Sequence, residues 1–281
     1  MPEFLSLPPE LIFHVYCSLD SIGDAYFLSQ TSKQTYYIVS QQKSQPKIFD
    51  AIIDNITQDP APAQAWLEAQ FGPGSLWQPT EATPPVDLTD DETLEFLLDV
   101  GFPLVNLPRV GFNSIFLRQF VDEEQRFYGC TLDDLYIMFH PEERDELPVL
   151  SLCFGVISSQ LVMLNNNNGI IYFYDLLGGL YMNCVRGIIA YVPDTFVVLL
   201  GMVVVVTKDL CKVSPDVSQR NFKRGVEVLM NSLDVQRKKL GDYDFAVDYY
   251  SEFWDDVFDN SLGGRRGFGL YVFNGFAGMS E

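Results

Sequence analysis

The sequence predicts an α+β fold, in which a short N-terminal helical module precedes a central antiparallel sheet flanked by helices. As far as about residue 103, apolar residues recur at helical spacing between helix-start and helix-stop residues. Short alternating or wholly apolar runs then follow to about residue 187, which is typical of strands. A chain of 281 residues fits one large domain or two smaller ones. We expect a module over residues 1–50 and a larger α+β domain over residues 60–281.

The composition is that of a folded, acidic protein. With 47% hydrophobic residues the chain is not disordered throughout, and its net charge of −20 disfavours nucleic acid and anionic membranes as direct partners. Basic proteins suit such a surface. Five scattered cysteines without a CxxC pair indicate reduced thiols in an intracellular protein, cytoplasmic or nuclear. The start lacks the basic segment of a signal peptide, and the longest apolar run, Phe196 to Val206, is too short to span a bilayer.

Four short helices are predicted in the first sixty residues. Pro8 and Pro9 suit the first turn of the first helix, and Glu10 suits its dipole. Its apolar face carries Leu11, Val15 and Leu19, with Ile12 and Tyr16 beside them. The other helices are expected at Ala25 to Gln30, at Lys33 to about Gln42 with Tyr36, Tyr37 and Val39 exposed, and at Ile48 to Ile56. Three such helices in under fifty residues cannot build a stable core, so they lean on a partner or on the rest of the chain.

About forty of these residues resemble an F-box. The resemblance is carried by Leu7-Pro-Pro-Glu-Leu11, Leu19, Ser29-Gln-Thr-Ser-Lys33 and Tyr36. The sequence departs from the family at Gln30-Thr31, where an aliphatic residue is commoner, and it lacks the usual third-helix tryptophan. The resemblance implies docking on the Skp-type adaptor of a cullin–RING ubiquitin ligase, with the following residues in contact: Leu7, Pro8, Glu10, Leu11, Val15 and Leu19. The alternative is an ordinary helical bundle at the start of a larger domain.

The best-defined helix lies at residues 88–103. Thr89 is the N-cap candidate, and Glu92 completes a capping box. Leu94, Leu97 and Leu98 fall on one face, which Phe96 and Val100 widen. Gly101 can take the left-handed position after the helix, and Pro103 blocks its continuation. A helix that starts at Asp59 or Ala61 and is ended by Gly72 is expected before it.

Five strands are predicted after Pro103. The Asn168-Gly169 pair predicts a primed hairpin turn, since both residues tolerate a positive φ. Leu177 to Leu180 is a second turn, so the strands form an antiparallel meander. The predicted strands are Ile115 to Phe120, Val149 to Gly155, Gln160 to Leu164, Gly169 to Asp175 and Tyr181 to Gly187.

The C-terminal part contains two further helices and one ambiguous segment. One helix starts at Ser214-Pro-Asp216 and runs to about Leu240, and Ser251 caps the last one. Phe196 to Val206 is rich in valine, which favours a strand, but Pro193-Asp194-Thr195 before it is a helix-start signal. The glycine and aromatic tail at Gly267 to Phe276 fits an edge strand or a loosely ordered arm.

Residues 62–262 resemble the SUKH superfamily of Smi/Knr and toxin-immunity proteins. The likeness rests on Leu88 to Pro103, on Phe154-Gly155, on Gly169 to Asp175, on Val192 to Phe196, and on Asp244-Phe-Ala246 before Ser251 to Trp254. Val156 and the long connection Gln125 to Leu147 depart from the family pattern. The family fold implies that Phe196 to Val206 is a helix, and we expect one.

No catalytic or metal-binding constellation is evident, so we expect neither an enzyme nor a cofactor. Cys153 lies in an apolar run and is expected to be an inert buried thiol. His14 is expected to be structural and His140 solvated, and two histidines are too few for most metal sites. Lys208 to Lys239 holds eight basic residues against four acidic ones. Three interpretations are open for the basic residues Arg220, Lys223 and Arg224 of this segment. They form a solvated helix face, they pair with acidic loops nearby, or they bind a small anion or nucleic acid.

Two function classes follow. In the first, the chain is a non-enzymatic adaptor, an F-box-type substrate receptor whose SUKH-like domain binds a protein ligand. In the second, the large domain is an immunity-type or regulatory protein that neutralises a basic, nucleic-acid-targeting toxin or effector, and the first helices only cap it. In both, the ligand of the large domain is expected to be a basic protein, bound through the sheet and its loops.

Overall fold

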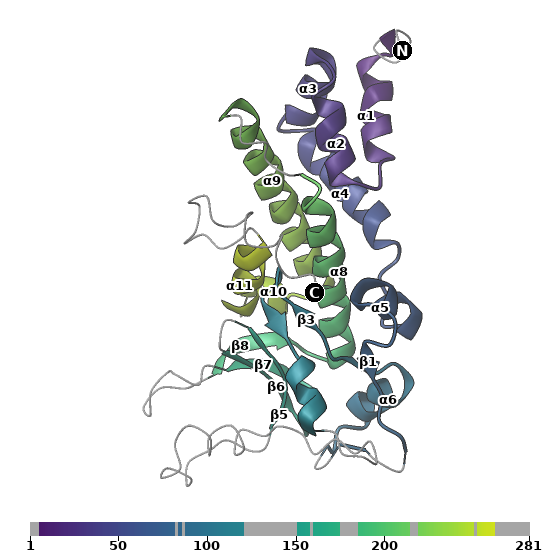
Figure 1. Cartoon of the computed structure of the whole chain (residues 1–281), viewed down its shortest axis with the longest axis vertical. Coiled ribbons are helices and arrows are strands. Elements are labelled where there is room, and N and C mark those ends of the chain that lie inside the picture. The colour runs from purple at the N-terminus through teal and green to yellow at the C-terminus, as the bar shows by residue number, and fades with distance from the viewer. Residues whose placement is uncertain are drawn as a thin grey trace, which may run out of the picture. The chain divides into compact units, whose positions relative to one another are not determined.

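The computed structural model describes residues 6–81, 84–85, 88–120, 151–157, 160–174, 185–213, 219–249 and 252–261. Helices and antiparallel strands make up these residues, so the predicted α+β class is confirmed (Figure 1). The chain divides into two compact units. We call Met1–Pro60 with Met202–Tyr243 the helical unit, and Ala61–Gly201 with Asp244–Glu281 the sheet unit.

The helical unit is larger than the predicted module of residues 1–50, because it also contains residues from late in the chain. Helix α4 packs against α9, and α2 contacts α9 as well (Figure 1). The end of α8 belongs to this unit, whereas the start of α8 belongs to the sheet unit. The helices are α1 (Pro9–Cys17), α2 (Ile22–Ser29), α3 (Lys33–Ser40), α4 (Gln45–Thr57), α8 (Pro193–Leu210) and α9 (Gln219–Tyr243).

Serine caps fix where the short helices begin. The Ser21 hydroxyl accepts the Asp24 N–H, so α2 starts three residues before the predicted Ala25. Ser32 and Thr35 form a complete capping box at the start of α3. Among the α3 residues predicted to be exposed, Tyr36 and Tyr37 are exposed, but Val39 is buried in the core.

The sheet unit is built on a six-stranded antiparallel sheet. Its order is β3-β4-β5-β6-β7-β8, so every strand pairs with its neighbours in sequence. A two-stranded sheet, β1-β2, stands apart from it. The strands are β1 (Leu76–Trp77), β2 (Phe102–Pro103), β3 (Asn106–Leu107), β4 (Phe112–Asn113), β5 (Ser151–Ile157), β6 (Gln160–Asn165), β7 (Ile171–Tyr174) and β8 (Val185–Ala190). The helices are α5 (Gln64–Phe71), α6 (Asp91–Asp99), η2 (Ile115–Phe120), α10 (Ala246–Tyr249) and α11 (Glu252–Ser261).

Aromatic rings join the sheet to its helices. The Phe196 ring of α8 lies 5.9 Å from the Phe112 ring of β4 and 5.9 Å from the Phe253 ring of α11. Phe253 in turn meets Phe173 of β7, edge to face. The Trp254 indole N–H donates to the Ile189 carbonyl at 3.0 Å, which satisfies the polar end of a fully buried ring.

The ambiguous segment Phe196 to Val206 is helical, inside α8. Its side chains are nearly all buried. Tertiary packing therefore overrides the strand preference of its valines.

Two predictions for the region after Pro103 are wrong. Ile115 to Phe120 forms the 3-10 helix η2 instead of a strand, because the Asn113 side chain accepts the Ile115 N–H and the Ser114 carbonyl accepts the Leu117 N–H. The turn after β6 is not of the primed two-residue type. There Gly169 has φ +69°, but Asn168 is not among the residues with a positive φ.

The predicted cap of α6 is also wrong. Asp90, not Thr89, is the N-cap, and its carboxylate accepts the Thr93 N–H at 2.9 Å. Thr89 is held instead by the β6–β7 turn, where the Asn166 carbonyl accepts its N–H and its hydroxyl. Gly101 follows α6 with φ +92°, as predicted. Helix α5 ends at Gly72, also as predicted, although it starts at Gln64.

Several predictions lie outside the described residues. They concern the start of the Val149 strand, residues 175–184 with the turn at Leu177, the helix start at Ser214, the Ser251 cap and the tail at Gly267 to Phe276.

Candidate functional site

The start of α1 presents the residues predicted to dock on a partner. Pro8 is the N-cap and uses no side-chain hydrogen bond, while its carbonyl accepts the N–H groups of Leu11 and Ile12 at 3.0 and 3.2 Å. Pro9 occupies the first helical position, where its missing N–H costs nothing. Glu10 lies exposed in the first turn. The motif therefore builds a well-formed helix start with a carboxylate at the surface.

The side of α1 that packs inward is next to the predicted docking face. Ile12 and Tyr16 are completely buried, and the Tyr16 hydroxyl donates to the Thr35 carbonyl of α3 at 3.1 Å. Leu11 is 49% exposed. Of the other predicted contact residues, Pro8 and Glu10 are exposed, and Leu7, Val15 and Leu19 are half-buried. The predicted docking face is thus partly or fully accessible.

Large apolar side chains are concentrated on the first three helices. Seven such side chains are exposed among the described residues, and four of them belong to α1, α2 and α3. We call these four the N-terminal apolar set: Leu11 (49% exposed), Phe27 (53%), Tyr36 (37%) and Tyr37 (63%). Single exposed apolar residues are common on proteins, but four of them within the 27 residues from Leu11 to Tyr37 make this region a candidate interaction surface. Phe27 was not predicted, because the sequence offers no helical repeat across the short α2 that would show which side it faces.

Side-chain hydrogen bonds from α3 and α4 hold α1, the helix that carries Leu11 of the N-terminal apolar set. The Gln34 amide of α3 donates to the Leu7 carbonyl at 3.2 Å, which ties α3 to the start of α1. The Asn55 amide of α4 donates to the Cys17 and Leu19 carbonyls at 3.0 and 2.8 Å, which satisfies the end of α1. Both ends of α1 are therefore held by neighbouring helices.

The net charge is divided very unevenly between the two units. The helical unit holds 11 Lys and Arg against 12 Asp and Glu, a net charge of −1. The sheet unit holds 7 against 26, a net charge of −19. Nearly the whole charge of −20 thus belongs to the sheet unit.

Two helices of the sheet unit carry much of its described charge. On α6, four exposed carboxylates follow one side of the helix: Asp91, Glu92, Glu95 and Asp99. On α11, burial raises the pKa of Asp256, and repulsion from Asp259, Glu252 and Asp255 raises it further. The helix dipole favours the carboxylates in the first turn of each helix (Asp91, Glu92, Glu252 and Asp255), whereas repulsion between like charges at i, i+4 opposes the rows as a whole.

Of the three candidate reactive side chains in the sequence, Cys153, His14 and His140, the structure describes the first two. Cys153 is completely buried, and its thiol donates to the Gly155 carbonyl, as expected of an inert thiol. His14 is exposed on α1 and contacts the Phe13 ring edge to face. His140 lies outside the described residues. Within the described part of the chain, no group of three or more His, Cys, Asp or Glu is placed to hold a metal ion.

Two of the basic residues between Lys208 and Lys239 are engaged within the helical unit. Lys212 pairs with Asp209, and Lys239 pairs with two aspartates of α4. The acids concerned lie on helices α8 and α4, whereas the pairing considered from the sequence was with acidic loops. The side chains of Arg220, Lys223 and Arg224 are not among those described.

Comparisons of the chain with protein-family models, with curated proteins and with solved structures found no match. The F-box and SUKH resemblances therefore stay predictions from the sequence. A search of the described helices also finds none that is both long enough and apolar enough to cross a membrane.

Proposed function

We propose that this protein is a non-enzymatic protein-binding adaptor, an F-box-type substrate receptor of a cullin–RING ubiquitin ligase. In this proposal the N-terminal apolar set and the Leu7-Pro-Pro-Glu10 start dock on the Skp-type adaptor. The sheet unit binds the protein ligand that is brought to the ligase.

One observation carries this proposal. The face of α1 that the F-box resemblance assigns to docking is accessible, while Ile12 and Tyr16 beside it make the contacts that hold α1 in place. An ordinary bundle helix would bury its most apolar side chains. Leaving Leu11 half exposed on a helix with a buried face costs hydrophobic stabilisation that a partner would recover.

The test is capture of a purified Skp-type adaptor by the full chain. Because Leu11 is half exposed, Leu11→Ser should leave the fold intact, yet we expect it to weaken adaptor binding by at least about tenfold, the loss of one well-packed apolar anchor. The matched control is Tyr243→Ser, since Tyr243 at the end of α9 is 44% exposed in the same unit and lies outside the proposed surface. Failure of the unmodified chain to bind the adaptor, or equal binding by Leu11→Ser, refutes the proposal.

A second candidate function rests on the charge of the sheet unit. A net charge of −19 favours encounter with a basic protein, which also suits an immunity-type inhibitor of a basic, nucleic-acid-targeting effector. In that case the chain binds its basic ligand but no Skp-type adaptor.

Binding of a basic ligand is tested by the association kinetics of partners that are captured from a lysate on the immobilised full chain. Association should slow markedly as the Debye length falls below about 10 Å. A salt-independent rate, or an acidic partner, contradicts it. Adaptor binding by the same preparation decides between the two functions.

A further inference from the structure

A buried carboxylate from late in the chain holds the start of α2. Asp209, in the last turn of α8, is only 4% exposed. Its Oδ1 accepts the Ser21 hydroxyl at 3.0 Å, and its Oδ2 accepts the Ile22 N–H. Ser21 is the N-cap of α2 and Ile22 its first residue. The charge of Asp209 therefore lies where the α2 dipole and its free N–H groups favour an anion.

The segment after Asp209 packs closely on the same turn. The Lys212 ammonium lies 2.6 Å from Asp209 Oδ1, which neutralises the buried carboxylate. A Cβ atom added at Gly23 would lie 2.9 Å from Lys212 Cβ, so only glycine fits beside it without a shift. Residues 209–212 thus touch the first turn of α2 through hydrogen bonds and through close packing.

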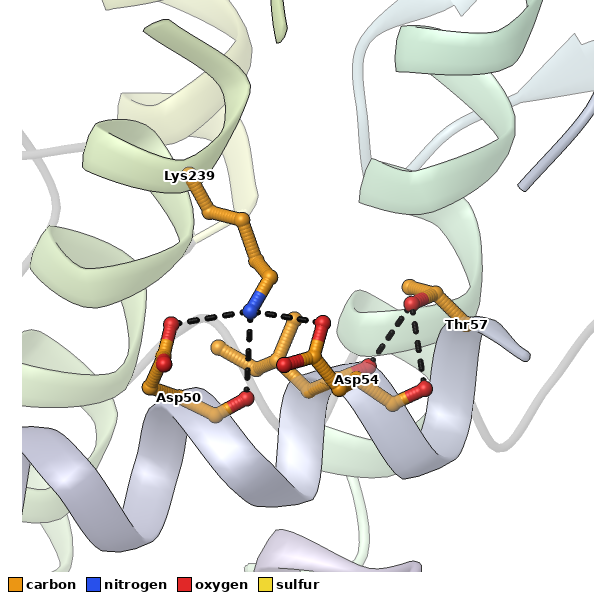
Figure 2. A network of polar contacts seen from close by, with 5 residues as sticks. Asp50, Asp54, Thr57 and Lys239 are labelled. Atoms are coloured by element: carbon orange, nitrogen blue, oxygen red, sulfur yellow. Dashed lines mark hydrogen bonds and ion pairs between the residues drawn. The ribbon is translucent and has the colours of Figure 1, made fainter. Parts of the chain in front are cut away.

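A second connection joins α4 to α9 (Figure 2). The Lys239 ammonium lies 2.8 Å from Asp50 Oδ1 and 2.7 Å from Asp54 Oδ1, and it also donates to the Asp50 carbonyl. Burial lowers the pKa of Lys239, but the hydrogen bonds that its ammonium donates to the two carboxylates outweigh that effect and leave the pKa raised. Lys239 is therefore charged at neutral pH and bridges two successive turns of α4. Nearby, the Asn231 amide donates to the Gln45 side chain at 3.0 Å.

These contacts bear on whether the N-terminal helices can act alone. Without residues 202–243, the α2 N-terminus would lose its buried anion, and the side of α4 that meets α9 would be uncovered. A chain of about fifty residues buries too little apolar surface to tolerate such losses easily.

We infer that the docking helices are not a detachable module, and that Asp209 is a positioning residue that holds α2, and with it the N-terminal apolar set, in its binding arrangement. The inference that Asp209 positions α2 rests on geometry alone, whereas the inference that it supports docking rests on the proposed function. In consequence, the docking unit is composite, made of the N-terminal helices and residues 202–243.

The test uses the full chain carrying Asp209→Ala, with hydrogen exchange measured by mass spectrometry. Loss of the carboxylate leaves the buried Ser21 hydroxyl and Ile22 N–H without their acceptor. We expect exchange of the α2 amides to rise by about tenfold or more, as local opening becomes easier, while the β6 amides exchange as in the unmodified chain. Adaptor capture should fall in parallel. Exchange of α2 within about twofold of the unmodified chain overturns the inference, since local opening would then be unaffected.

Two further variants make the result specific. Asp209→Asn keeps the shape of the side chain and one carbonyl acceptor, so we expect a smaller rise in α2 exchange than for Asp209→Ala. It takes the place of Asp209→Ala if that variant does not fold. Asp234→Asn removes one negative charge from an exposed position of α9 and should change neither readout.

The outcomes separate this inference from the proposed function. Faster α2 exchange in Asp209→Ala, with no adaptor bound by the unmodified chain, supports the positioning role and refutes the adaptor function. Equal adaptor binding by the unmodified chain and by Asp209→Ala refutes the link between Asp209 and docking.

Discussion

The N-cap of α6 offers the sharpest test of how much a local hydrogen bond stabilises the fold compared with a contact between distant residues. Both the N–H and the hydroxyl of Thr93 donate to Asp90 Oδ2, at 2.9 and 2.5 Å, and Thr93 is completely buried. Replacing Asp90 with alanine removes an N-cap, which costs about 1 kcal/mol. It also leaves the buried Thr93 hydroxyl without its acceptor, which costs about 1–3 kcal/mol more. We therefore expect Asp90→Ala to lower the free energy of unfolding by about 2–4 kcal/mol.

Thr89→Ala should cost less. The Thr89 side chain is exposed and donates to the Asn166 carbonyl at 3.1 Å and to the Asn167 side chain at 2.9 Å. After the substitution the Asn166 carbonyl still accepts the N–H groups of Thr89 and Asp90. The expected loss is about 0.5–1.5 kcal/mol, the net value of an ordinary hydrogen bond.

The assay is urea unfolding followed by tryptophan fluorescence. All three tryptophans (Trp66, Trp77 and Trp254) belong to the sheet unit, which also contains α6, so the signal reports the affected unit. Asp90→Asn serves as a control for charge, because asparagine is an equally good N-cap and should cost less than about 1 kcal/mol. A larger loss for Thr89→Ala than for Asp90→Ala would restore Thr89 as the cap and refute the reasoning.

Three further substitutions in the sheet unit can be measured in the same assay. Leu97→Ala should cost about 2–5 kcal/mol, because Leu97 is completely buried, and a neutral result would mean that the packed side of α6 is assigned wrongly. Gly201→Ala should destabilise by about 1–3 kcal/mol despite its better helix propensity, because the new Cβ would lie 2.6 Å from the Trp66 ring; a gain in stability would show that the ring moves freely. Asp256→Asn should stabilise the protein at neutral pH. Burial, and then repulsion from neighbouring carboxylates, raises the pKa of Asp256 in the folded state. Ionisation of Asp256 therefore opposes folding above that pKa. This gain should vanish as the pH falls below the ordinary aspartate pKa of 3.8, where both states are protonated; a gain that persists at low pH contradicts the electrostatic cause.

The sequence predicts most helices because their start and stop signals are local. It fails where two local solutions compete and a distant contact decides between them. Two neighbouring residues are reasonable N-caps here, each with a partner three residues later: Thr89 with Glu92, and Asp90 with Thr93. The Asn166 carbonyl, which lies 77 residues away, engages Thr89 and leaves Asp90 to cap the helix. A one-residue error at a helix end is therefore the expected result of reading local chemistry alone.

The sequence contains a local helix signal before Ile115 to Phe120, the segment for which a strand was wrongly predicted. Asn113-Ser114 immediately before the apolar run is a helix-start pair. The buried Ser114 hydroxyl donates to the Pro103 carbonyl at 2.6 Å and accepts the Val105 N–H at 3.0 Å, which fixes the chain where it turns. Apolar content alone favoured a strand, because a short apolar run does not distinguish strand from helix.

The candidate docking face could be predicted in part. The residues of the α1 motif and the exposure of Tyr36 and Tyr37 follow from sequence pattern, and the structure agrees on their accessibility. The role of Asp209 could not be predicted, because nothing in the sequence relates it to Ser21, which is 188 residues away. In its own segment it resembles any acidic residue at the end of a helix.

The division of charge between the two units is compatible with the two kinds of partner in the proposed function. The helical unit is nearly neutral, and most of the exposed large apolar side chains that are described in it belong to the N-terminal apolar set. Apolar contacts act only at short range and are little affected by salt. The sheet unit has a net charge of −19, which acts over about a Debye length and mainly sets the rate of encounter. If the proposed function is right, a permanent partner suits the first surface and an exchanging basic ligand suits the second, because short-range apolar contact favours lasting association and long-range charge favours fast encounter.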